Sequence, residues 1–162
     1  MKSCKACARN PKLFAILVSI VFGTGSAMAD EHELTMSGLS NWLDAYGAAW
    51  ETRDADAAAK IFSEDATYQV TPYEEPHVGQ EGVRNYWAGV TENQRNVQFE
   101  HEAISVTGNT GIAHWSAKFE VAPDGTAIEL NGIFVLEFDE HGKCRSLREW
   151  WHLQMPGAEE QD

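Results

Sequence analysis

The stretch IELNGIFVLEFDEHGKCRSLREWWHL, residues 128–153, decides the fold because it holds two long runs in which apolar and polar side chains alternate. Alternation with a period of two is typical of β-strands, since successive side chains point to opposite faces of a sheet. The polar tripeptide Glu140-His141-Gly142 between the two runs indicates a hairpin turn. The second half of the chain therefore predicts four strands joined by short turns, at roughly 96–106, 111–121, 127–138 and 143–153.

The first half of the chain changes to a helical period. Apolar side chains at this spacing predict an amphipathic helix over roughly 38–53, carried by Leu39, Trp42, Leu43, Tyr46 and Trp50. The sequence then predicts a short helix capped by Asp54, a short strand at 66–70 and a third helix over roughly 80–93. Strands of about ten residues are longer than usual, so we expect strong curvature. The prediction is an α+β fold with three N-terminal helices on a strongly curved, mostly antiparallel sheet.

The N-terminus has the three parts of a secretory signal. Residues 1–12 carry four cationic side chains and no acid, residues 13–22 are a continuous apolar run, and Ala27-Met28-Ala29 provides small residues for a peptidase. A membrane anchor is the alternative, but a helix needs roughly 20 apolar residues to cross a bilayer. We expect a cleaved signal peptide at 1–29 and a periplasmic or secreted protein. A single domain would cover 30–156, and 157–162 would be a flexible acidic tail.

Charge and residue types exclude several classes of partner. The formal net charge is −13, and loss of a cationic leader makes it more negative, so the surface repels nucleic acid and anionic lipid. After cleavage Cys144 is the one remaining cysteine, which rules out an internal disulfide. The six histidines show no H-x-H or H-x-x-x-H pair, and no glycine-rich phosphate loop is present, so we expect no metal and no cofactor.

An ordered set of features is similar to a known superfamily. Residues 61–68 read Ile-Phe-Ser-Glu-Asp-Ala-Thr-Tyr, and Tyr86-Trp87, the turn 138–143 and the run 148–152 (Arg-Glu-Trp-Trp-His) follow in order. On these residues the chain resembles the nuclear transport factor 2-like superfamily and, within it, the SnoaL-like group, over roughly 39–153. The resemblance implies a cone-shaped α+β body with a pocket between helices and sheet. It leaves open isomerases, dehydratases, cyclases, epoxide hydrolases and non-catalytic binding domains.

Three polar side chains fall on the apolar phase of their elements and are the candidate catalytic residues: Tyr46, His101 and Glu149. Burial raises the pKa of a carboxyl and lowers that of an imidazole, which brings both toward neutral pH for general acid–base catalysis. A tyrosine hydroxyl can donate to a developing oxyanion. The expected ligand-binding residues around them are aromatic, namely Trp50, Tyr68, Trp87, Trp115, Phe119, Phe134 and Trp151.

Each candidate also has a structural interpretation. Tyr46 could be a core residue whose hydroxyl bonds to the backbone, and His101 could be a satisfied core histidine or turn outward. Glu149 could form an ion pair with Arg148, Arg145 or Lys118.

The ketosteroid isomerase branch of the superfamily offers one further comparison. Tyr46 falls where that branch has its oxyanion-binding tyrosine. The branch's catalytic aspartate would fall near Val70 or Thr71 and its second acidic donor near Phe134, and none of these is acidic. The resemblance therefore does not carry that mechanism to this chain.

Two hypotheses of function remain. The first is an exported SnoaL-like domain that binds a small, largely apolar molecule in an aromatic pocket, with cofactor-free acid–base catalysis of the isomerase, dehydratase or cyclase type. The second is a non-catalytic homodimeric binding or interaction domain. In that case the outer sheet face would pair with a second copy, because Ile133 and Val135 give that face apolar content.

Overall fold

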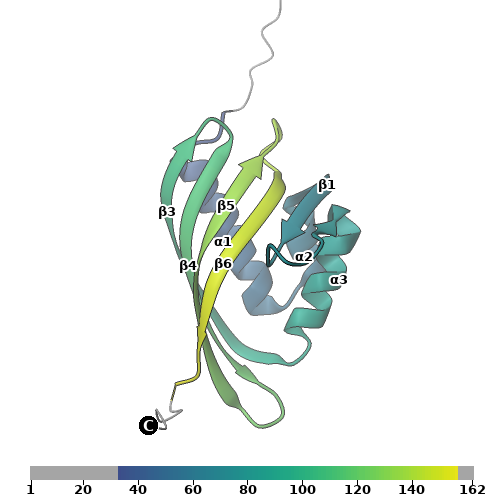
Figure 1. The fold of residues 1–162 in the computed structure, drawn as a ribbon, viewed down its shortest axis with the longest axis vertical. Helices are drawn as coiled ribbons and strands as arrows, with labels where there is room; N and C mark the ends of the chain where they lie inside the picture. The colour runs from purple at the N-terminus through teal and green to yellow at the C-terminus, as the bar shows by residue number, and fades with distance from the viewer. Residues whose placement is uncertain (1–32, 157–162) are drawn as a thin grey trace, which may run out of the picture.

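The computed structural model describes residues 33–156, which form an α+β fold around one six-stranded mixed sheet (Figure 1). The strand order is β2-β1-β6-β5-β4-β3, and every neighbouring pair is antiparallel except β1 and β6, which are parallel. The α+β class and the mostly antiparallel sheet are thus confirmed. The elements in chain order are α1 (Met36–Thr52), α2 (Ala55–Lys60), β1 (Phe62–Gln69), β2 (His77–Val78), α3 (Gly79–Thr91), β3 (Gln94–Thr107), β4 (Thr110–Val121), β5 (Thr126–Phe138) and β6 (Cys144–Gln154).

Some details differ from the expectation. Strand β1 begins at Phe62, four residues before the predicted start, because an irregularity between Phe62 and Thr67 breaks the alternation on which the prediction depended. The two-residue strand β2 was not predicted. The strong curvature of the sheet stays a prediction, and the predicted signal peptide and acidic tail lie outside the described residues.

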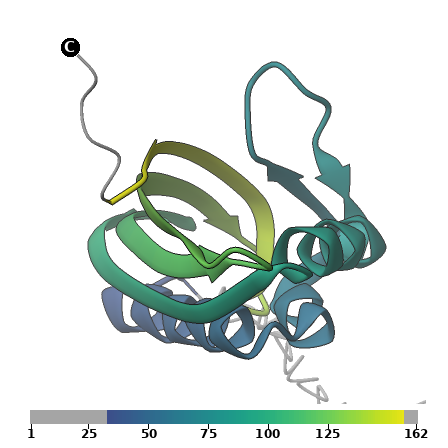
Figure 2. The same cartoon turned by 90° about the horizontal axis from the view of Figure 1, so that it is seen from below.

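Helix α1 forms and ends where its sequence dictates. The Thr35 side chain caps its first turn by accepting a hydrogen bond from Gly38 N at 3.0 Å, and Arg53, in the left-handed conformation, ends it. Its buried face includes the five residues that predicted the helix, Leu39, Trp42, Leu43, Tyr46 and Trp50. Figures 1 and 2 show α1 along one face of the sheet, with α2 and α3 beside β1. No helix of residues 33–156 is long and apolar enough to cross a membrane.

A glycine in the middle of β5 lets a tryptophan from each neighbouring strand pack closely against it. Gly132 stands opposite Trp115 of β4 on one side and Trp151 of β6 on the other. A Cβ atom at this position would lie 2.8 Å from the Cβ atom of Trp151 and 3.0 Å from Cε2 of Trp115. The glycine therefore leaves the space that the Trp115 and Trp151 side chains need.

The parallel strands β1 and β6 separate next to Glu149. The last paired positions of β1 and β6 are Gln69 and Arg148, whereas β6 continues to Gln154. Glu149 is the first residue of β6 beyond this point, and it faces the same side of the sheet as Phe134, which pairs with it on β5. The helices and the sheet thus meet around Glu149.

Candidate functional site

A cavity of about 210 Å³ lies between the helices and the sheet, and its wall is mostly aromatic. Helices α1 and α3 and the strands of the sheet all contribute to it. The lining residues are Tyr46, Trp50, Tyr68, Tyr86, Trp87, Val90, Gln94, Trp115, Phe119, Leu130, Glu149, Trp151 and Leu153.

Glu149 is the one ionisable carboxyl group in this wall, and it ends a chain of hydroxyl groups. The Tyr68 hydroxyl donates to Glu149 Oε1 at 3.4 Å, and the hydroxyls of Tyr46 and Tyr68 are 2.8 Å apart. The glutamate is only 5% exposed. Tyr46 comes from α1, Tyr68 from β1 and Glu149 from β6, so the chain connects a helix with two parallel strands.

Burial governs the ionisation of this cluster. It raises the pKa of Glu149 to about 8, and the hydrogen bond from Tyr68 offsets only part of that rise. Burial, together with the nearby charge of Glu149, also raises the pKa of Tyr46 and of Tyr68 well above the ordinary value. At neutral pH Glu149 is therefore mostly a neutral carboxylic acid that can give or take a proton.

Two of the three ion-pair partners considered for Glu149, Arg145 and Lys118, pair with other acids. Arg145 Nη2 lies 3.2 Å from Glu137 Oε2, and Lys118 Nζ lies 3.1 Å from Glu129 Oε1. All four of these side chains lie at least partly in solvent. Glu149 instead faces the cavity with a tyrosine as its hydrogen-bond partner.

Two of the three candidate catalytic residues come together, and the third lies elsewhere. Tyr46 and Glu149 both line the cavity. His101 shares the inward face of β3 but lies beneath α1, where its Nε2 atom is 2.9 Å from Asp44 Oδ1, and it is not part of the wall. The phase of a strand identifies the face on which a residue lies, but not which part of a helix covers it.

Six of the seven aromatic residues expected around the ligand line the cavity: Trp50, Tyr68, Trp87, Trp115, Phe119 and Trp151. Phe134 is the exception. It is fully buried, its ring stacks on Trp115 with centroids 5.0 Å apart, and it contacts Tyr46 at 5.2 Å. It supports the wall from beneath.

Sequence reasoning missed five lining residues. Tyr86, Val90, Leu130 and Leu153 are large apolar or aromatic residues at helical or strand spacing in the predicted elements, so the same reasoning could have included them. Gln94 could not be found in this way, because a bulge between Arg95 and Gln98 shifts the phase of β3. Asn96, inside the bulge, has a φ of 54°, and asparagine tolerates this conformation better than most residues. Gln94 Oε1 accepts the indole N–H of Trp50 at 2.7 Å.

Glu149 and Trp151 also border a second hollow of about 300 Å³. Its other lining residues are Val70, Thr71, Pro72, Trp150 and His152, from the end of β1 and the outer part of β6. Glu149 therefore borders both the aromatic cavity and this second hollow, at the point where β1 and β6 separate. Among residues 33–156 no group of three or more His, Cys, Asp or Glu side chains is placed to hold a metal ion.

Comparison with known proteins gives a family and a fold. The sequence profile of the SnoaL-like domain matches residues 43–147. No curated protein matches the sequence of the chain.

Three solved structures illustrate the similarity in fold. The first is SalBIII, an epoxide hydrolase/cyclase-like enzyme with a role in pyran ring formation in salinomycin, at 20% identity and a TM-score of 0.62, covering 72% of this chain and 94% of that one. The second is a Bacillus subtilis protein provisionally assigned as an isomerase, at 17% identity and a TM-score of 0.64, covering 74% and 90%. The third is a Catenulispora acidiphila protein with a ketosteroid isomerase-like fold in complex with trimethylamine, at 17% identity and a TM-score of 0.60, covering 67% and 83%.

Proposed function

The chain belongs to the SnoaL-like domain family, and we propose that its domain binds a small, largely apolar molecule in the aromatic cavity and exchanges a proton with it through Glu149. The observation that carries this proposal is a single buried carboxyl group in a wall that is mostly aromatic. A buried acid costs stability, so its presence in a cavity supports a functional role.

The size of the cavity limits the ligand. An engineered protein cavity of about 150 Å³ holds benzene, whereas sites for drug-sized molecules occupy about 300–1,000 Å³. A cavity of about 210 Å³ therefore suits a molecule with one ring or a compact branched group. A fused polycyclic compound would need the wall to move.

The chemistry that fits these residues is cofactor-free acid–base catalysis of the isomerase, dehydratase or cyclase type. Glu149, with a pKa of about 8, can act as acid or base near neutral pH. The Tyr68 hydroxyl can donate to a substrate oxygen that gains charge once it turns its single proton away from Glu149 Oε1. Tyr46 supports Tyr68 through the 2.8 Å contact between the two hydroxyls. The cyclase-like and isomerase-assigned proteins of similar fold are consistent with this class of reaction.

Native mass spectrometry of the protein isolated from its source under gentle conditions tests the proposal. We expect a reproducible excess mass that disappears on denaturation and that identifies the bound molecule. With that molecule as substrate, Glu149→Gln should lower kcat by about 10²-fold or more, the usual contribution of a general acid or base. Unchanged turnover would remove Glu149 from the mechanism.

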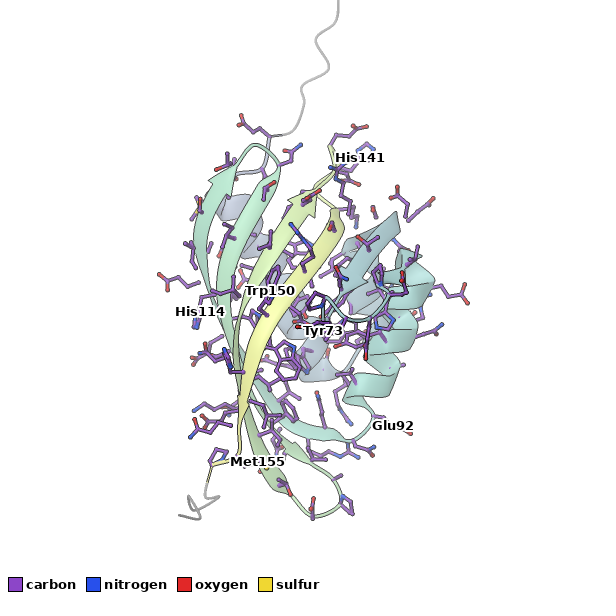
Figure 3. All side chains as sticks on the ribbon, viewed as in Figure 1. Tyr73, Glu92, His114, His141, Trp150 and Met155 are labelled. Atoms are coloured by element: carbon purple, nitrogen blue, oxygen red, sulfur yellow. The ribbon has the colours of Figure 1, made fainter. Side chains whose placement is uncertain are left out.

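A non-catalytic homodimer is the second candidate, and the outer face of the sheet favours it. Trp150, Ile104 and Ile112 on this face are 50%, 51% and 37% exposed, and Ile133 and Val135 of β5 lie between their strands. Figure 3 shows Trp150 on the side of the sheet opposite α1. Such an apolar strip supports pairing with a second copy of the chain, and a protein that carries no bound molecule would favour this alternative.

We also propose that the domain works outside the cytoplasm, in the periplasm or the medium, after removal of residues 1–29. The support is the order of cationic, apolar and small residues in this stretch. N-terminal sequencing of the exported protein tests it, and a first residue other than Asp30 would move the cleavage site.

A further inference from the structure

Three aromatic rings of the cavity stand at right angles to one another. The planes of Tyr46 and Trp50 meet at 90°, those of Tyr46 and Trp87 at 84°, and those of Trp50 and Trp87 at 86°. The three centroids lie between 5.0 and 6.3 Å apart. These three residues, here called the aromatic corner, pack edge to face against one another, and all three line the cavity.

The corner and the carboxyl group of Glu149 line the same cavity. Tyr46 links them, because its ring belongs to the corner and its hydroxyl lies 2.8 Å from the Tyr68 hydroxyl that donates to Glu149. The face of an aromatic ring carries negative electrostatic potential and attracts a cation, most strongly at tryptophan. The cavity thus combines several aromatic rings with one group that can become an anion.

The net charge of the molecule also favours a cationic ligand. The formal net charge is −13, with 25 acidic and 12 basic side chains, so cations accumulate near the surface and anions are repelled. The basic residues nearest to Glu149 in sequence do not enter the wall of the cavity, and Arg145 is bound to Glu137.

We propose that the ligand is a compact organic cation, a substituted ammonium ion whose alkyl or aryl groups lie against the aromatic corner and whose charge is balanced by the carboxylate of Glu149. This inference rests on the proposed function, because it names the class of molecule that the same cavity binds. A trimethyl- or benzyl-substituted ammonium ion is compact enough for a cavity of about 210 Å³.

The proton balance of binding follows from the state of Glu149. In the empty cavity the group is mostly protonated below pH 8. A permanent cation binds to the carboxylate form, so the carboxylic acid loses one proton to solvent and the bound pair is neutral. The affinity should therefore fall by up to about tenfold for each pH unit below 8, as expected for a single linked proton.

The tyrosines that face Glu149 do not change the predicted fall in affinity below pH 8. Tyr46 of α1, Tyr68 of β1 and Tyr86 of α3 face it, and burial raises the pKa of all three phenols, so they stay neutral over this range. On the side of the open hollow, His152 of β6 is exposed and borders the same space. Repeating the binding measurements with His152→Asn, which replaces the imidazole with a neutral amide, tests whether this side chain contributes to the pH dependence.

The test uses two probes of the same shape, benzyltrimethylammonium and its uncharged carbon analogue neopentylbenzene. Quenching of tryptophan fluorescence reports binding, since four tryptophans line the cavity. At about pH 9 we expect the cation to bind at least tenfold more tightly than the analogue. We also expect its affinity to fall toward about pH 6, with release of one proton in weakly buffered solution, while the affinity of the analogue stays constant.

Glu149→Gln keeps the shape of the side chain and removes its charge. This variant should lose at least tenfold in affinity for the cation, lose its pH dependence, and bind neopentylbenzene as the unaltered protein does. Equal affinity for the two probes, or a cation affinity that is independent of pH and of Glu149, would overturn the inference and leave the proposed function in place. If neither probe binds, the inference is wrong, and native mass spectrometry decides separately whether the cavity binds another small molecule.

Discussion

At the scale of single residues, the free energy of unfolding should depend on pH through Glu149. The pKa of this carboxyl is about 8 in the folded protein and near 4.5 in the unfolded chain, so the folded state holds one more proton between these values. The contribution of Glu149 to the free energy of unfolding is therefore greatest below about pH 4.5. It declines by up to about 1.4 kcal/mol per pH unit as the pH rises to 8. Glu149→Gln should remove this decline and stabilise the protein at pH 8. Urea unfolding at several pH values measures it.

A matched control is Glu102→Gln, which removes an exposed carboxyl on β3. It should leave the slope of stability against pH unchanged. If Glu149→Gln behaves in the same way as this control, Glu149 is ionised in the folded protein and its proposed role as an acid at neutral pH is wrong.

Tyr68 affects the pKa of the Glu149 carboxyl group. Its hydrogen bond to Glu149 lowers the pKa of the acid, and its hydroxyl is also the partner of Tyr46. Tyr68→Phe should raise the pKa of Glu149 further above its ordinary value and cost about 1–2 kcal/mol, because the Tyr46 hydroxyl is left buried without this partner. Carbon NMR of the glutamate carboxyl gives the pKa directly. A lower pKa in the variant would mean that the hydroxyl group does not stabilise the carboxylate.

At the scale of elements, Gly132 shows how one small residue in β5 shapes the cavity wall. Gly132→Ala places a methyl group 2.5 Å from the Trp150 carbonyl oxygen and 2.8 Å from Trp151 Cβ, so strand or side chains must shift. We expect a loss of about 1–3 kcal/mol in the free energy of unfolding, the usual cost of overpacking.

Gly89 of α3 is the matched control, since a Cβ atom there meets nothing within 4 Å. Gly89→Ala should stabilise the protein by about 0.5–1 kcal/mol through helix propensity. Both changes can be measured by urea unfolding. Equal effects of the two substitutions would show that the contact of Trp151 with Gly132 does not constrain the strand.

At the scale of the whole molecule, the outer face of the sheet determines the predicted oligomer. If that face pairs with a second copy, Trp150→Glu places a charge in the interface and should shift the protein from dimer to monomer in sedimentation experiments. Tyr73→Glu is the control, since Tyr73 is 94% exposed on the loop between β1 and β2 and belongs to no strand of the sheet. A monomer in the unaltered protein, or a dimer that survives Trp150→Glu, contradicts the pairing.

The sequence by itself determined the elements and the faces they bury. Leu39 to Trp50 predicted α1 because helical spacing is a local property, and the alternation in 128–153 predicted β5 and β6 for the same reason. The inward phase of Glu149 among apolar neighbours was also visible, because strand periodicity fixes which face a side chain takes.

Only the tertiary structure decided which inward residues share a cavity. Tyr46, Tyr68 and Glu149 come together because β1 runs parallel to β6 and α1 crosses behind them, and this pairing joins residues 81 positions apart. His101 had the same local pattern as Glu149 but lies under α1 beside Asp44. Gln94 precedes the predicted strand 96–106, and the bulge in β3 lets it share the buried face with Val97. Long-range packing and local irregularities of the backbone are set by the assembled core, so the local pattern of residues could not predict them.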